Sequence, residues 1–193
     1  MLWRIYGKYY TIESNPFINN NCRIRLGAIP DSIDRRAYLL DEWQYLNDKE
    51  EFIQFERMGN DLPDIYTLNI PLISKRLKET LDDAEVSNTF YKPIYLYEEQ
   101  NRSKVEEYYL MLVEALDCID WDKSEHTVNS FSGLKKITGP FTIKTPAVGN
   151  FKIFKIKSIM NRFWVIDEEL KEKFESLGIK GAKILPPEKY YGI

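Results

Sequence analysis

The chain shows the same order of apolar and polar positions twice: an apolar run, a capping residue and an amphipathic helix. The first instance begins with the apolar run 70–73, followed by Ser74, a residue type that caps helix N-termini well. Leu77, Leu81 and Ala84 then fall at i, i+4 and i+7, so they share one side of a helix. This pattern predicts a strand that leads directly into a short helix with one buried face.

The second instance lies near the carboxyl end of the sequence. The apolar run 163–166 leads to Asp167, another good N-cap, and Gly178 is placed to end the helix. The positions expected to be buried repeat the earlier spacing: Leu170, Phe174 and Leu177. A shift of 93 residues aligns the two instances, which indicates two weakly similar strand-helix-strand units. The alternative is that any capped helix after an apolar strand aligns equally well.

The remaining regular pattern is that of β-strands. Strands are predicted at 2–12 (a strand or a short hairpin), 90–97, 108–116 and 151–157, where aromatic and β-branched residues gather. Pro93 places the second of these near a sheet edge, because proline cannot donate a ladder hydrogen bond. In the last, lysines alternate with apolar residues and predict one solvated face.

Polar and turn-forming residues separate these elements. Turns or loops are predicted at 13–16, 19–21, 58–64, 98–104 and 130–139. The stretch 31–55 stays open, because Ile33, Ala37, Leu40 and Trp43 suit one helical face, whereas 51–56 alternates as a strand does. The fold class expected is α+β, a mostly antiparallel sheet with two short amphipathic helices. It forms a single domain over 1–193, with a β-rich part at 1–60 and a second part at 61–193.

The composition removes several classes of function. The 193 residues include 27 Lys and Arg against 30 Asp and Glu, and 14% are aromatic, which is typical of a folded protein. With a net charge of −3, the chain lacks the excess of Lys and Arg that binding to nucleic-acid phosphates requires, so direct nucleic-acid binding is not expected. No apolar run approaches the roughly 20 residues that span a bilayer, and no signal peptide is recognised, so we expect a cytoplasmic protein without membrane contact.

Few residues are available for catalysis or for a cofactor. His126 is the single histidine, which excludes sites built from two histidines within the chain. Cys22 and Cys118 form no CxxC motif, and we expect them to be reduced and buried. The nine glycines are scattered and form no phosphate-binding loop. We therefore expect no cofactor and no catalytic residues.

Two patches in which acids surround a tryptophan are the candidate binding surfaces. An aromatic residue within a charged rim has the composition of an interface anchor, although either patch could also be ordinary surface. The first patch, the Trp43 patch, is Asp41, Glu42 and Trp43, continuing to Asp48, Glu50 and Glu51. The second, the Trp121 patch, is Asp117, Asp120, Trp121, Asp122 and Glu125.

Three alternatives give such residues a chemical role. The four acids within 117–125 could hold a divalent metal in a hydrolase or nuclease, but the glycine and closing Glu of a calcium loop are missing. A nuclease site of the restriction-enzyme type would need Pro30-Asp31 or Pro63-Asp64 together with Glu169-Leu170-Lys171, which lies in the second predicted helix. Lys75 and Arg76, in the first turn of the first helix, could bind an anion, or could simply be solvated.

A family resemblance adds to this interpretation. Three segments carry it: Asp64-Ile65, the run from Ile70 through Leu81, and Tyr108-Tyr109-Leu110 through the Asp-rich turn ending at Lys123-Ser124. The chain resembles immunity-protein family eleven, whose members occur beside polymorphic toxins, and the resemblance covers roughly 60–187.

The resemblance implies a protein that binds and neutralises a cognate toxin without catalysis. Many such toxins are nucleases with basic clefts, which would suit the two acidic patches. The competing hypotheses are the metal-dependent hydrolase described above and an accessory protein that only scaffolds.

Overall fold

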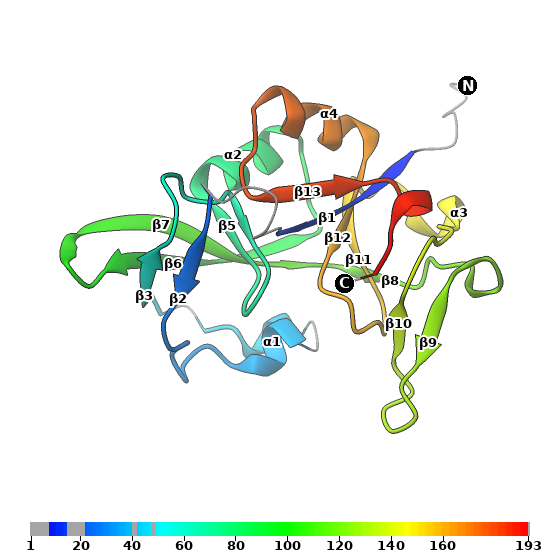
Figure 1. The fold of residues 1–193 in the computed structure, drawn as a ribbon, viewed down its shortest axis with the longest axis horizontal. Helices are drawn as coiled ribbons and strands as arrows, with labels where there is room; N and C mark the ends of the chain where they lie inside the picture. Colours follow the sequence, from blue (N-terminus) through cyan, green and yellow to red (C-terminus); the bar gives the residue numbers. More distant parts are fainter. Residues whose placement is uncertain (1–7, 15–21, 40–41, 48, 193) are drawn as a thin grey trace. The chain divides into compact units, whose positions relative to one another are not determined.

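The computed structural model describes residues 8–14, 22–39, 42–47 and 49–192. It is an α+β fold with mostly antiparallel sheets, which confirms the predicted class (Figure 1). Residues 2–7 of the strand or hairpin predicted at 2–12, and the predicted loop at 19–21, lie outside the described residues. No helix in the described ranges is long and apolar enough to cross a membrane.

The chain divides into two compact units, each built from separated segments. The first comprises Met1–Ile12, Glu114–Leu177 and Ile184–Ile193; the second comprises Glu13–Val113 and Gly178–Lys183. The prediction of a single domain stays a prediction.

The second unit is organised around a six-stranded sheet in the order β2-β3-β6-β7-β5-β4. Its strands are β2 (Ile24–Leu26), β3 (Glu51–Arg57), β4 (Ile65–Tyr66), β5 (Leu72–Ser74), β6 (Thr89–Glu98) and β7 (Asn101–Val113). Three helical segments accompany it: α1 (Arg35–Leu39), the 3₁₀ helix η1 (Trp43–Tyr45) and α2 (Lys75–Asp83). Neighbouring strands of this sheet pair antiparallel, except β3 with β6, which are parallel.

The core of this unit forms where the strands turn their apolar side chains to one face. Ile53, Ile94 and Leu110 from three neighbouring strands are fully buried there, together with Ala37 of α1. The helix α2 begins as the sequence predicts, because the Ser74 hydroxyl accepts a hydrogen bond from the Leu77 backbone N–H. Its predicted apolar positions Leu77, Leu81 and Ala84 are all buried.

The first unit contains a five-stranded sheet in the order β13-β1-β12-β11-β8 and a separate hairpin of β9 and β10. Its strands are β1 (Tyr9–Ser14), β8 (Ala115–Leu116), β9 (His126–Val128), β10 (Lys135–Ile137), β11 (Ile153–Ile156), β12 (Trp164–Asp167) and β13 (Ala182–Leu185). Its helices are η2 (Trp121–Lys123), α3 (Thr145–Val148), α4 (Glu168–Ser176) and η3 (Pro187–Lys189). The unit boundary falls inside β1 and inside β13.

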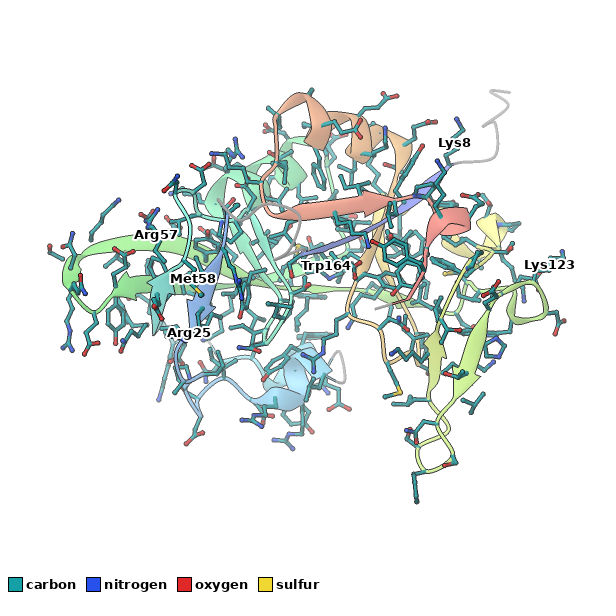
Figure 2. The ribbon with its side chains drawn as sticks, in the orientation of Figure 1. Lys8, Arg25, Arg57, Met58, Lys123 and Trp164 are labelled. Atoms are coloured by element: carbon teal, nitrogen blue, oxygen red, sulfur yellow. The ribbon has the colours of Figure 1, made fainter. Side chains whose placement is uncertain are left out.

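An aromatic cluster fills the centre of the first unit. Phe141, Phe163 and Tyr190 lie with ring centroids 5.1–5.9 Å apart, and all three are almost fully buried. Phe154 is fully buried in the same cluster and meets the Tyr9 ring edge-on. Trp164, labelled in Figure 2, is 3% exposed. Aromatic burial of this extent explains why the aromatic content of the sequence predicts a folded protein.

The second predicted helix is also confirmed. The Asp167 carboxylate accepts from the Leu170 backbone N–H, and Gly178 has the positive φ of a residue that ends a helix. Leu170 and Phe174 are buried, but Leu177 is 45% exposed, so the predicted apolar face of this helix extends one residue beyond the buried part. Both predicted strand-helix-strand segments are present, as β5-α2-β6 and β12-α4-β13.

Some strand boundaries were predicted wrongly. Glu13 and Ser14 continue β1 rather than form a turn, and residues 101–104 and 135–137 belong to strands rather than loops. Pro93 does not mark an edge strand, because β6 lies between β3 and β7. Pairing with β3 begins only at Ile94, which lies opposite Glu51, so Pro93 precedes the start of β3 and needs no ladder bond to that strand. The open stretch 31–55 contains both α1 and β3, while Leu40 lies outside the described residues.

Both described cysteines, Cys22 and Cys118, are buried free thiols, as expected. Burial raises the pKa of Cys22 from 9.0 to about 11, and nearby carboxylates of Asp64 and Asp61 add to the shift. Burial, with a contribution from Asp117, raises the pKa of Cys118 to about 12.

We therefore expect the native thiols to react with Ellman's reagent at pH 8 at least ~100-fold more slowly than the thiols of the unfolded chain. The unfolded thiols ionise first as pH rises, so stability should fall progressively above about pH 9. Following the rate of thiol release in buffer and in denaturant measures the effect. Equal rates in the two conditions would contradict the burial of both residues.

Candidate functional site

The Trp43 patch is an exposed aromatic surface of the second unit. Trp43 begins η1, is 54% exposed, and stacks on Phe90 of β6 with ring centroids 5.0 Å apart and planes 5° apart. Phe90 is itself 45% exposed. Glu42 precedes the pair, whereas Asp41 and Asp48 lie outside the described residues. The structure thus adds an aromatic partner to the predicted anchor, contributed by a strand far away in the sequence.

A buried lysine holds the segment that carries Trp43. Lys92 lies two residues after Phe90 in β6 and is 3% exposed. Its ammonium donates to the backbone carbonyl of Asn47 (2.7 Å), to Oδ1 of Asn47 (2.8 Å) and to the carbonyl of Lys49. The carboxylate of Glu51 lies 3.9 Å away. Strand β6 therefore supplies both Phe90, whose ring stacks on Trp43, and Lys92, whose ammonium binds the segment that follows η1.

A second aromatic pair lies exposed on β3 and β6. Phe52 is 53% exposed and stacks on Tyr95, with centroids 5.2 Å apart. Glu107 of β7 lies opposite Tyr95 in the register, and hydrogen bonds from Lys75 (2.8 Å) and Tyr109 hold the pKa of its carboxyl below its usual range. Sequence reasoning missed this pair, although the alternation over 51–56 already sets Phe52 apart from the buried Ile53.

The Trp121 patch lies in the first unit, and its tryptophan is partly buried. Trp121 opens η2 and packs against the aromatic core cluster. His126 meets its ring at 4.9 Å, and the Lys135 ammonium lies 4.1 Å from the ring centroid, a cation–π contact. Asp120 pairs with Lys123 at 3.1 Å, and Lys123 points outward in Figure 2. The tryptophan is thus held between a histidine and a lysine.

The acids of the Trp121 patch do not converge. Asp117, Asp122 and Glu125 are exposed, and Glu125 lies directly against Gly139. Within the described ranges, no group of three or more His, Cys, Asp or Glu side chains is placed to hold a metal ion. The arrangement provides an acidic surface rather than a set of ligands.

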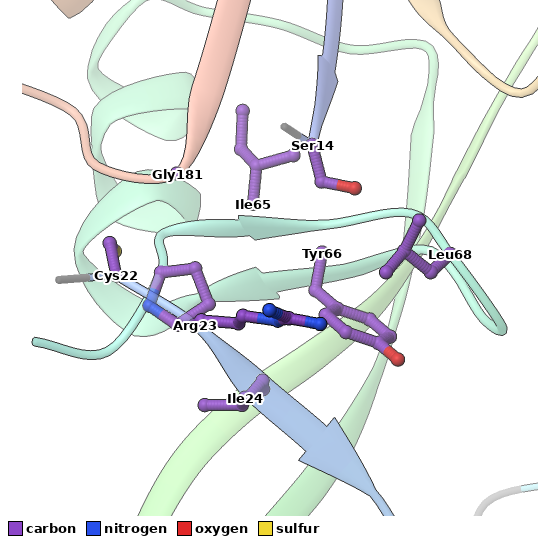
Figure 3. Close-up of a pocket in the computed structure, with 9 residues that line it drawn as sticks. Ser14, Cys22, Arg23, Ile24, Ile65, Tyr66, Leu68 and Gly181 are labelled. Carbon is purple, nitrogen blue, oxygen red and sulfur yellow. The ribbon is translucent and has the colours of Figure 1, made fainter. Parts of the chain in front are cut away.

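A small pocket lies in the second unit (Figure 3). Nine residues line it: Ser14, Cys22, Arg23, Ile24, Pro63, Ile65, Tyr66, Leu68 and Gly181. Figure 3 shows Arg23 and Tyr66 among the side chains that line it. These nine residues include neither a carboxylate nor a histidine, and the Cys22 thiol has a raised pKa. They assemble no nucleophile with an adjacent base.

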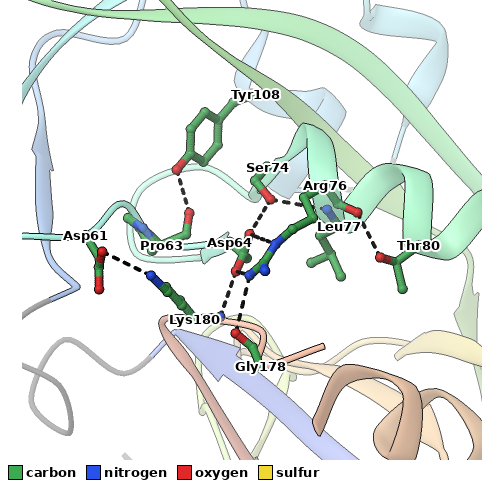
Figure 4. A network of polar contacts seen from close by, with 10 residues as sticks. All are labelled: Asp61, Pro63, Asp64, Ser74, Arg76, Leu77, Thr80, Tyr108, Gly178 and Lys180. Carbon is green, nitrogen blue, oxygen red and sulfur yellow. Dashed lines mark hydrogen bonds and ion pairs between the residues drawn. The ribbon is translucent and has the colours of Figure 1, made fainter. Parts of the chain in front are cut away.

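The candidate nuclease residue Asp64 belongs to a polar network (Figure 4). Its carboxylate is buried and accepts hydrogen bonds from the Ser74 hydroxyl (2.6 Å), the Arg76 guanidinium and the Lys180 backbone N–H (2.7 Å). Arg76, considered above as an anion-binding residue, also donates to the Gly178 carbonyl at 3.3 Å. The network ties β4 and the start of α2 to the late segment 178–183.

Three other candidate residues for a nuclease or anion site also have partners in the fold. Lys75 pairs with Glu107, Glu169 pairs with Lys152 at 2.7 Å, and Lys171 pairs with Glu175 at 2.8 Å. Glu169 and Lys171 lie in α4, as the sequence predicts, where their side chains diverge. Each of these three side chains is therefore engaged in an ion pair within the fold.

Comparison with known families gives one result with a direct bearing on function. A family model described as an immunity protein family, Imm11, matches residues 17–186. The match begins well before the limit of about residue 60 that the resemblance suggested, so most of the β-rich amino-terminal part is included. The comparison with curated proteins found no match. Because the family model covers most of the sequence, this chain belongs to the Imm11 immunity protein family.

Proposed function

We propose that this chain binds a cognate toxin domain in the bacterial cytoplasm and neutralises it without catalysing a reaction. The toxin would belong to a polymorphic or contact-dependent system. The family match over residues 17–186 is the observation that carries the proposal. An inhibitor of this kind needs a well-ordered surface with aromatic anchors and complementary charge.

The exposed aromatic pairs support this proposal. The rings of Trp43 and Phe90 are already stacked in the free protein, so ordering them for binding would lose little conformational entropy. Glu42 and Glu50, the acids of the Trp43 patch that are partly or fully exposed, would complement a basic surface on the toxin, such as the substrate cleft of a nuclease. Inhibition would then follow from covering that cleft.

Co-expression with the toxin encoded beside this chain tests the proposal. A sensitive cell should grow when both are produced, and the two proteins should co-purify. A toxin mixed with this protein should lose activity at a one-to-one ratio. Rescue at far below that ratio would indicate turnover and contradict a stoichiometric inhibitor.

Replacing Trp43 with alanine should weaken toxin binding by about 10- to 100-fold, because an exposed, stacked aromatic is the side chain expected to anchor the contact. Titration calorimetry with an inactive toxin variant measures the change. The matched control is Met58→Ala, which removes another exposed apolar side chain of the same unit.

The Trp121 patch is tested separately with a triple variant of Asp120→Ala, Trp121→Ala and Asp122→Ala. Unchanged toxin affinity in that variant would remove the Trp121 patch from the contact surface. Unchanged toxin affinity in Trp43→Ala would likewise remove the Trp43 patch from the contact surface.

A further inference from the structure

The hairpin of β9 and β10 carries an aromatic side chain that the fold does not use. Its strands pair through Val128 with Lys135 and His126 with Ile137, and the connecting loop spans 129–134. Figure 1 shows that loop as the far end of the hairpin. Phe131 in the loop is 99% exposed, so it contributes almost no burial to the folded chain.

The loop that presents Phe131 is ordered by its own hydrogen bonds. The Oδ1 atom of Asn129 accepts from the backbone N–H groups of Phe131 (3.0 Å) and Ser132 (2.9 Å). The backbone of Asn129 exchanges further bonds with Gly133 and Leu134, both at 2.9 Å. Gly133 has φ +68°, a conformation that glycine adopts without strain. The exposed ring therefore projects from a defined turn.

The base of the hairpin is fixed as well. The Asn161 side chain accepts from the Ile137 backbone N–H (2.8 Å) and donates to its carbonyl (3.0 Å). Ile137 is fully buried in the core cluster of its unit. A two-stranded hairpin is marginally stable alone, and these contacts anchor it at the end opposite Phe131.

The surface around the tip is apolar and basic. Val128, Leu134 and Met160 are 57%, 39% and 47% exposed, and Met160 lies beside β10 through a backbone bond to Lys135 (2.8 Å). The segments 126–137 and 157–164 together contain four cations and no Asp or Glu, although the whole chain has a net charge of −3. The four cations are Lys135, Lys136, Lys157 and Arg162.

We propose that this hairpin inserts Phe131 into an apolar pocket of the toxin domain whose rim carries carboxylates. The inference rests on the proposed function and assigns it a contact at the tip of the hairpin whose base meets the Trp121 patch. Because the loop is already ordered, binding need not order it, so burial of the ring contributes directly to affinity. Lys135 and Lys136, the first two residues of β10, directly follow the loop and favour an acidic rim over a basic one.

The test compares single variants of the full chain against an inactive variant of the toxin domain encoded beside it. Phe131→Ala should weaken binding at least about tenfold, which corresponds to about 1.4 kcal/mol, while Phe131→Leu should retain most of the affinity. Lys136→Glu should also weaken binding, more strongly at low salt than at high salt. The matched control is Ser130→Ala in the same loop, which should bind as the unsubstituted protein does. All four should keep the unfolding temperature, because these side chains lie outside the core.

Binding of Phe131→Ala with unchanged affinity would overturn the inference while leaving the proposed function intact. Absence of binding by the unsubstituted protein would overturn both. Sedimentation with vesicles of phosphatidylcholine and phosphatidylglycerol provides the remaining outcome. Vesicle binding that depends on Phe131, without an effect of Phe131 on toxin affinity, would assign the tip to a bilayer and contradict the pocket.

Discussion

Replacing Asp64 with alanine is expected to lower the free energy of unfolding by about 2–4 kcal/mol. The carboxylate is 5% exposed and accepts bonds from a hydroxyl, a guanidinium and a backbone N–H. Its removal leaves the Ser74 hydroxyl and the Lys180 N–H without this acceptor. Bonds to an ionised group are the stronger kind, and a buried donor that loses its partner keeps its full desolvation cost.

Denaturant unfolding followed by circular dichroism measures this effect. Asp61→Ala is the matched control, because Asp61 is 48% exposed and makes a single ion pair with Lys180 at 3.0 Å. Exposed pairs of this kind contribute about 0–1 kcal/mol. If Asp64→Ala and Asp61→Ala lowered the free energy of unfolding equally, the hydrogen bonds of the buried Asp64 carboxylate would contribute no more than an exposed ion pair.

Replacing Lys92 with methionine is expected to cost about 2–3 kcal/mol and to loosen the segment that carries Trp43. Methionine keeps much of the volume but donates no hydrogen bond. Two backbone carbonyls and the Asn47 side chain would lose their donor, and the buried Glu51 carboxylate would lose its nearby cation. The loss should therefore be largest in residues 42–47 and at the start of β3.

Hydrogen exchange of individual backbone amides detects this local change, and denaturant unfolding measures the total loss in the free energy of unfolding. Lys104→Met is the control, since Lys104 lies in β7 of the same unit, is 63% exposed and pairs only at the surface with Glu106. If Lys92→Met and Lys104→Met both lowered the free energy of unfolding only slightly, and hydrogen exchange in residues 42–47 did not change, the bonds of Lys92 would not stabilise this segment.

The helices could be predicted because the signals for them are local. Ser74 and Asp167 each cap the helix that follows, and both predicted apolar stripes are buried apart from Leu177. The short strands of the β9–β10 hairpin could not be predicted in the same way. Each has only three residues, and their register depends on partners across a six-residue loop.

The candidate site was predictable only in part. Acids around Trp43 correctly marked an exposed tryptophan, but its stacking partner Phe90 lies 47 residues later and is brought near by the fold. Trp121 is covered by His126 and Lys135 through a strand pairing that the sequence does not reveal. A lone lysine in a strand usually indicates a solvated face, so nothing in the sequence marks Lys92 as buried.

The second unit includes the late segment Gly178–Lys183, and the first includes Ile184–Ile193. A ribosome makes the chain from the amino end, so Asp64 is synthesised long before its Lys180 partner, and β1 long before the neighbouring β13. The second unit therefore stays incomplete while the intervening segment Glu114–Leu177 is synthesised and until Gly178–Lys183 has left the exit tunnel.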